Sequence, residues 1–334
     1  MIFNDLSKKE RLELYQEVHN KNGLSKIIIE KDWWVTSILR ALFSLPYAEN
    51  LSFKGGTSLS KCWSLIERFS EDVDIAVNRE YLGFVGTLSK TQINDRLRRA
   101  ACSFVREKLQ HDLAKQLENN RINPNDFSVK VNITPISTTD PEIIEVEYDS
   151  LFTEENYIKR KVIIEVSGRS MSEPLQLVLL RSMIDEEFKD EEFAEIPFEV
   201  RAVVPQRTFI EKICLLHDEF AKPQDTMRTE RMSRHLYDLV QIMDTPIAEK
   251  ALSDKHLYNS VVEHRRVFVG LKGFDYSTLA PQTIKIVPPD YVIDLWKTDY
   301  ETMQRTMIYG KSLPFEKLID KIKELNEKVN KIEW

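Results

Sequence analysis

The sequence predicts an α/β fold, in which a mixed, twisted sheet flanked by helices is followed by a helical C-terminal lobe. Up to residue 204, short runs rich in β-branched residues alternate with helical runs, whereas the apolar residues beyond it recur mainly at helical spacing. The chain has 334 residues, more than one hydrophobic core usually organises. We therefore expect two lobes, residues 1–204 and residues 205–334, with Pro205 at the boundary.

The first lobe is expected to begin with two helices, over residues 5–19 and 26–45, because apolar residues recur there every three or four positions. Trp33 and Trp34 lie on the second helix. Large aromatic side chains at such positions belong more often to a core than to a ligand-stacking surface, and we favour the core for both.

Residues 51–77 join a glycine turn to two carboxylates. Residues 51–54 alternate as a strand, and two glycines follow where the backbone must turn sharply and can approach a ligand. A helix is expected from residue 57 to residue 66. The free N–H groups of its first turn, with two hydroxyls beside them, would form a phosphate cradle to which Lys54 adds charge. The candidate phosphate-binding residues are Gly55, Gly56, Thr57, Ser58 and Lys61.

Residues 72–77 read as a strand on which Asp72 and Asp74 share one face while Val73 and Ile75 face the core. Paired carboxylates beside a phosphate cradle suit Mg²⁺. With 54 acidic residues in 334, about nine such acid-x-acid triplets arise by chance. The glycine turn, not the triplet alone, therefore supports the assignment of a metal site.

The segments GGTS (55–58) and RFSEDVD (68–74) together resemble the first motif of the AbiEii/MenT-like nucleotidyltransferase toxins, which are similar to polymerase-β-type nucleotidyltransferases. The resemblance covers about residues 30–245 and is weak between residues 78 and 155. It implies an enzyme that uses Mg²⁺, or Mn²⁺, to transfer a nucleotide from an NTP to RNA, with the tRNA 3′ end as acceptor. It also implies a toxin of a toxin–antitoxin or phage-defence (abortive infection) system, with an antitoxin or transcriptional regulator encoded nearby as partner.

Further strands are expected over residues 128–136, 143–148, 159–166 and 198–204. In the third of these, Glu165 interrupts an apolar run, and a buried carboxylate is costly unless a cation or hydrogen bonds compensate. The resemblance implies that Glu165 is the third metal-binding carboxylate, and a structural ion pair is the alternative. Arg169 follows as its partner or as a phosphate contact.

The second lobe is expected to begin with a helix from Thr208, because Thr208 and Glu211 have the spacing of a capping box. Lys212 would then lie in the first turn, where a cation gains nothing from the helix dipole and a functional task such as contacting phosphate is favoured. The resemblance identifies Glu211-Lys212 as a later motif of the family.

Residues 231–243 form the next expected helix, and RHLYDL within it resembles the block that ends the family's catalytic signature. Asp238 is the matching acid. His235 stands where the family often has aspartate, which leaves the second acid of the block open. A helix-surface or packed histidine is favoured over a catalytic base. Arg228 and Arg234 are candidates for contacting triphosphate or RNA.

Residues 89–118 are expected to form an inserted helix or helix pair. Its arginines, of which Arg98, Arg99 and Arg106 are the RNA-binding candidates, are interleaved with acids, so a solvated helix face is favoured over an RNA-facing stripe. The net charge of −7 argues against a general nucleic-acid coat but not against a local basic surface. Helices over residues 256–269, 288–307 and 314–332 complete the chain.

No segment reaches the 18 or so apolar residues needed to cross a membrane, and the three cysteines are scattered, so a cytoplasmic protein is expected. Three functions stay open: nucleotide transfer to RNA, nucleotide transfer to a small molecule or protein, and nucleotide binding by a non-catalytic regulatory module.

Overall fold

The computed structural model describes residues 2–70, 72–132, 141–153 and 159–334, which form two compact units. The first unit comprises Met1–Cys62 and Glu71–Val203, and the second comprises Trp63–Ser70 and Val204–Trp334. The segment Trp63–Ser70, between the glycine turn and the acidic strand, thus groups with the C-terminal residues.

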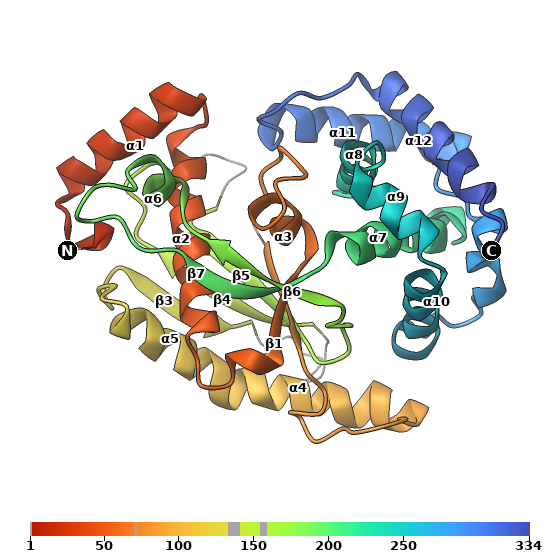
Figure 1. Ribbon diagram of the computed structural model, residues 1–334, viewed down its shortest axis with the longest axis horizontal. Coiled ribbons are helices and arrows are strands. Elements are labelled where there is room, and N and C mark those ends of the chain that lie inside the picture. Colours follow the sequence, from red (N-terminus) through yellow and green to blue (C-terminus); the bar gives the residue numbers. More distant parts are fainter. Residues whose placement is uncertain (1, 71, 133–140, 154–158) are drawn as a thin grey trace. The chain divides into compact units, whose positions relative to one another are not determined.

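The first unit is built on a seven-stranded mixed sheet of order β3-β4-β5-β2-β1-β7-β6, seen in Figure 1. The strands are β1 Leu51–Lys54, β2 Asp72–Val77, β3 Phe127–Val131, β4 Glu142–Tyr148, β5 Lys161–Ser167, β6 Leu175–Leu180 and β7 Phe198–Val203. The pairs β1/β7 and β2/β5 are parallel and the other neighbours are antiparallel. The predicted α/β class is confirmed.

Strand β6 is absent from the sequence-based prediction. Its sequence, LQLVLL, is a short apolar run without clear alternation, which periodicity cannot distinguish from a helical segment. The other strands lie where they were expected. The end of the predicted strand 128–136 and most of the turn after it fall at residues 133–140, outside the described residues.

Helix α2 (Lys26–Phe43) packs against one face of the sheet and forms the centre of the core of this unit. Trp34 stacks on Tyr148 of β4, with ring centroids 4.9 Å apart. Trp33 packs edge-on against Trp34, and both are at most 3% exposed. The prediction that both tryptophans belong to the core is confirmed. Helix α1 (Lys8–Asn22) covers α2, and the short helix α6 (Met183–Glu187) lies beside both.

The basic segment predicted as an insertion is one continuous helical stretch that packs on the sheet and on α2 (Figure 1). Two π-helical segments, Gln92–Leu97 and Val105–Leu109, alternate with α4 (Arg98–Phe104) and α5 (Gln110–Asn119). Apolar side chains at helical spacing along this stretch are fully buried, so it forms part of the core.

Helix α3 spans only Gly55–Lys61. The expectation of a helix from residue 57 to residue 66 is therefore wrong at both ends. It ends early because the following residues pack in the second unit: the Phe69 N–H donates to the Met307 carbonyl (2.7 Å), and the Tyr309 N–H donates to the Glu67 carbonyl (3.0 Å).

The second unit is helical, as predicted. Its helices are α7 Pro205–Phe220, α8 Ser233–Ile242, α9 Pro246–Ser253, α10 Lys255–His264, α11 Ile293–Thr306 and α12 Phe315–Asn330. Helix α9 was not predicted, and α8 packs against α7, α11 and α12. Among the described residues, none of the helices has the length and apolar character that crossing a membrane requires.

The predicted capping box of α7 is wrong. The helix begins at Pro205, with Val204 as its cap, and Thr208 is buried within it. Proline at the first helical position has its φ angle already set and no N–H to satisfy, so it starts this helix one turn earlier than the Thr–Glu pair suggests.

Candidate active site

Gly55 and Asp74 are in direct contact at the edge of the sheet face that carries the acid pair. Gly55 has φ +78°, the left-handed region, and a Cβ placed on it would lie 1.8 Å from Asp74 Oδ2. No other residue fits there without displacing the carboxylate. The glycine turn and the second acid of the motif therefore form one structural feature.

The strand register sets Asp74 between a lysine and a second carboxylate. Asp74 is the register partner of Lys54 on β1 and of Glu165 on β5. Register partners of neighbouring strands lie on the same face, about 4.8 Å apart. Val73 and Ile75 are buried on the opposite face, as predicted. Asp72, two residues before Asp74, shares the face of Asp74 and Glu165.

The three carboxylates have the chemistry that a divalent cation requires. Carboxylate oxygens are preferred ligands of Mg²⁺, and substrate phosphates usually complete its coordination shell. As the side chains stand, no three His, Cys, Asp or Glu residues of the described chain are grouped closely enough to hold a metal ion. The type of ligand nonetheless fits a divalent cation, because Asp72, Asp74 and Glu165 lie on one face of the sheet. The Gly55 backbone approaches this face closely.

Two polar side chains of α3 make contacts inside the protein. The Thr57 hydroxyl donates to the backbone carbonyl of Asp72. Lys61 forms an ion pair with Asp32 of α2. These contacts hold α3 against its neighbours. Ser58 is 2% exposed, and its hydroxyl has no hydrogen-bond partner among the described residues. All three side chains remain candidates for contacting phosphate, together with the backbone N–H groups of the turn.

A second cluster lies inside the second unit, around Asp238 of α8. Arg68 donates from Nε to Asp238 Oδ1 (2.7 Å) and from Nη2 to Oδ2 (2.8 Å). Lys212 Nζ lies 2.8 Å from Asp238 Oδ2. Arg68 is 1% exposed and Asp238 is fully buried. Arg68 was not predicted as a site residue. Its place in the RFSEDVD motif segment could have indicated a role.

Lys212 lies in the middle of α7, about two turns beyond Pro205, so the prediction of a first-turn position is wrong. Its Nζ also lies 3.3 Å from His235 Nδ1. An ammonium has three hydrogens, and the third has no partner among the residues that the structure describes. The side chain is 9% exposed, so this donor is desolvated and available to an anion.

The charges of this cluster fix its protonation states. Burial alone would raise the pKa of Asp238, but the Arg68 and Lys212 cations outweigh it and hold that pKa well below its usual range. Burial lowers the pKa of Lys212, and Asp238 opposes the shift. Burial, and then the Lys212 cation, hold the pKa of His235 well below its ordinary 6.5. His235 is therefore neutral at pH 7 and accepts a hydrogen bond from Lys212.

A family model described as "Nucleotidyl transferase AbiEii toxin, Type IV TA system" matches residues 37–321. The chain belongs to the AbiEii nucleotidyltransferase toxin family. It is therefore a nucleotidyltransferase of a family of toxin–antitoxin toxins, and the resemblance inferred from the GGTS and RFSEDVD segments is confirmed. The match includes both the carboxylate face and the Asp238 cluster.

The AbiEii chain is similar in structure to MenT4, a nucleotidyltransferase toxin from Mycobacterium tuberculosis H37Rv. The TM-score is 0.43 and the sequence identity 15%, over 95% of this chain and 97% of that one. No protein of curated function matches the chain.

Several arginines proposed for RNA binding in this AbiEii protein form ion pairs. Arg106 makes two hydrogen bonds to the buried Glu142, of 3.0 and 3.1 Å. Arg228 pairs with the buried Glu219 at 2.7 Å. These two stabilise buried carboxylates. All five arginines remain candidates for RNA contact. The Arg98 Nε is buried, Arg99 pairs with Asp95 at the surface, and the charge of Arg234 acts on His235.

Proposed function

We propose that this AbiEii-family chain transfers a nucleotide from an NTP to an RNA hydroxyl with release of pyrophosphate. The acceptor is the tRNA 3′ end, and the modification makes the chain a toxin. The contact between Gly55 and the Asp74 carboxylate gives the strongest support. A backbone turn that must be glycine, beside a face with three carboxylates, suits a triphosphate and a divalent cation better than it suits packing.

In this proposal Asp72, Asp74 and Glu165 hold the divalent cation, Mg²⁺ or Mn²⁺. When bound, such a cation neutralises charge on the triphosphate and lowers the pKa of a coordinated hydroxyl. The backbone N–H groups at Gly55 and Gly56 contact phosphate oxygens, and Lys54, beside Asp74 in the register, contributes positive charge.

Lys212 supplies its remaining N–H to a phosphate oxygen in this proposal. Asp238 and neutral His235 orient the ammonium, and Arg68 holds Asp238 in place. Arg68 of the second unit is only four positions before Asp72 in the sequence.

In this proposal the acceptor is a single-stranded RNA end. Arg98 and Arg99 on α4 are candidates for contacting the phosphates of a single-stranded RNA end. Transfer to a small molecule or a protein is the alternative, whereas membership of a nucleotidyltransferase family excludes the third function that the sequence left open, nucleotide binding without catalysis. An antitoxin partner is expected from membership of a toxin–antitoxin family.

The deciding experiment incubates the full chain with total RNA and each of the four α-labelled NTPs, with Mg²⁺ or Mn²⁺. Label is expected in RNA of tRNA size, and Asp72→Asn should abolish it while leaving the melting temperature close to that of the wild type. Label in protein or in a small molecule would favour the alternative acceptor. Absence of label under every condition would contradict the proposal.

The RNA surface is tested by the double variant Arg98→Glu and Arg99→Glu. It should reduce labelling of RNA, most strongly at low salt, and leave NTP binding unchanged. The matched control, Lys8→Glu and Lys9→Glu, makes the same change in net charge on exposed side chains of α1. Equal losses in both variants would show a general charge effect and no RNA surface at α4.

A further inference from the structure

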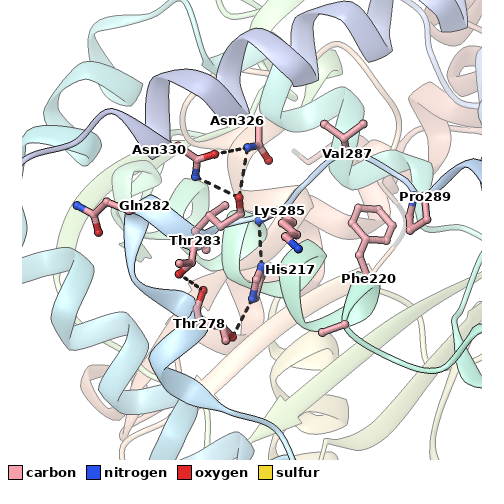
Figure 2. A pocket seen from close by; sticks show the side chains of 12 residues that line it. His217, Phe220, Thr278, Gln282, Thr283, Lys285, Val287, Pro289, Asn326 and Asn330 are labelled. Carbon is pink, nitrogen blue, oxygen red and sulfur yellow. Dashed lines mark hydrogen bonds between the residues drawn. The ribbon is translucent and has the colours of Figure 1, made fainter.

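The second unit contains a cavity of about 600 Å³ between α7, α12 and the segment of residues 278–289 (Figure 2). This volume is within the range typical of small-molecule sites. His217 lines it from α7, five residues beyond Lys212, which corresponds to about 140° around the helix. The cavity is therefore distinct from the Lys212 cluster although both use α7.

Two asparagines of α12 hold the extended segment that forms one wall. Asn326 Oδ1 accepts the backbone N–H of Ile286 (2.7 Å). Asn326 Nδ2 donates to the carbonyl of Ile284 and to Asn330 Oδ1. Asn330 Nδ2 donates to the carbonyls of Pro281 and Ile284. Each amide NH₂ has two hydrogens, so both asparagines use all their donors inside the protein.

His217, Thr278 and Thr283 use their hydrogen-bond donors inside the protein in the same way, whereas Gln282 donates to the Ile332 carbonyl and keeps one N–H that no described residue accepts. His217 Nδ1 accepts the Lys285 N–H (3.0 Å), so the proton is on Nε2 and is donated to Thr278 Oγ1 (3.0 Å). The hydroxyls of Thr278 and Thr283 donate to backbone carbonyls. Burial lowers the pKa of His217 to about 4, which keeps the ring neutral at pH 7. The two threonines and the two asparagines retain oxygen lone pairs, which can only accept hydrogen bonds.

Lys285 is the cation of the cavity. Its ammonium makes no hydrogen bond or ion pair with any residue that the structure describes, and no carboxylate is among the described residues that line the cavity. The apolar lining residues Phe220, Val287 and Pro289 lie together on one side in Figure 2. The Phe220 ring is held in place by Trp296, with ring centroids 5.0 Å apart.

A suitable ligand therefore has an apolar flat surface, hydrogen-bond donors and an anionic group. We propose that this cavity binds a nucleotide whose base carries an exocyclic amino group, with the base against Phe220, the amino group facing the carboxamide and hydroxyl oxygens, and the phosphate at Lys285. Adenine, cytosine and guanine nucleotides have this chemistry, whereas hypoxanthine and uracil lack the amino group. The nucleotide comes either free from solution or as part of an RNA strand. This site goes beyond the proposed transfer reaction and needs none of its catalytic residues.

The test measures binding by calorimetry to the full chain in EDTA, with the matched pairs AMP and IMP, and CMP and UMP. AMP and CMP should bind, and each partner that lacks the amino group should bind about tenfold more weakly. Lys285→Gln should weaken AMP binding about tenfold. The control Lys272→Gln, an exposed lysine of the same unit that does not line the cavity, should leave binding unchanged.

Further measurements distinguish the cavity from the Lys212 cluster, and a free nucleotide from an RNA strand as the ligand. Lys212→Gln should bind AMP as the wild type does, because the cavity does not use Lys212. Tighter binding of a short adenosine RNA than of AMP would identify an RNA strand as the source, and binding of AMP alone would identify the free nucleotide. Equal binding of IMP and AMP, insensitivity to Lys285→Gln, or no binding of any nucleotide would overturn the inference. None of these results depends on nucleotide transfer, so failure of the transfer assay would leave the inference intact.

Discussion

Arg68 and Asp238 are 170 residues apart in the sequence and form two parallel hydrogen bonds, of 2.7 and 2.8 Å, in the interior of the second unit. The pair joins the segment before the acidic strand to the helix that carries the last family motif. Because Asp238 also contacts Lys212, Arg68 determines the position of the lysine without touching it.

Replacing Arg68 by alanine should lower the free energy of unfolding by about 3–5 kcal/mol, because a buried carboxylate loses its bidentate partner. The matched control is Arg266→Ala, which removes a bidentate pair with Glu263 of similar geometry at the surface and should cost less than about 1 kcal/mol. Urea unfolding of both variants measures the difference. Equal losses would show that the buried pair contributes no more to the free energy of unfolding than the surface pair.

Gly55→Ala should abolish nucleotide transfer, because the new Cβ would displace the Asp74 carboxylate. Gly86→Ala is the matched control: Gly86 has φ +74°, and nothing lies within 4 Å of the position that the new methyl group would take. Both variants should lose similar stability from backbone strain, about 1 kcal/mol. If Gly55→Ala were as active as Gly86→Ala, nucleotide transfer would not depend on the close approach of the Gly55 backbone to the Asp74 carboxylate.

Lys212→Gln should reduce the rate of transfer by about 100- to 1,000-fold, corresponding to about 2.7–4 kcal/mol of transition-state stabilisation, by analogy with the loss of one oxyanion donor. Steady-state kinetics with saturating NTP measures the effect on kcat. Asp238→Asn should also be impaired because it weakens the contact that orients the ammonium. A Lys212→Gln protein with unchanged turnover and a lower melting temperature would make this lysine structural.

Stability should fall on acidification through His217. Burial lowers the pKa of His217 from 6.5 to about 4, so below pH 6.5 the unfolded chain takes up a proton more readily than the folded chain. The stabilisation that His217 contributes is complete above pH 6.5 and is lost as the pH falls towards 4. The urea midpoint should therefore drop more between pH 7 and pH 4.5 in the wild type than in His217→Asn. The exposed His256→Asn should behave as the wild type, and a His217→Asn protein with an unaltered acid transition would exclude this histidine as the cause.

The amino-acid sequence by itself determined the local features of the protein. The alternation of residues 72–77 placed Asp72 and Asp74 on one face, because side chains two apart on a strand always share a face. The glycine turn and the apolar periodicity of α2 and α8 likewise depend on nearby residues. These local patterns, with the motif resemblance, were sufficient for the fold class and the family.

The tertiary structure decided which distant groups meet. Helix α3 ends early because the residues after it pack in the other unit, and α7 begins at Pro205 although a plausible cap follows it. The partner of Arg68 could not be predicted from the sequence. The effect of a buried charge on stability depends on its partner, and only folding brings Asp238 within 3 Å of Arg68. For the same reason, the sequence could not distinguish Arg106, which pairs with the buried Glu142, from the surface arginines. The sequence shows the charge of a side chain, but burial determines whether that charge needs a partner inside the protein.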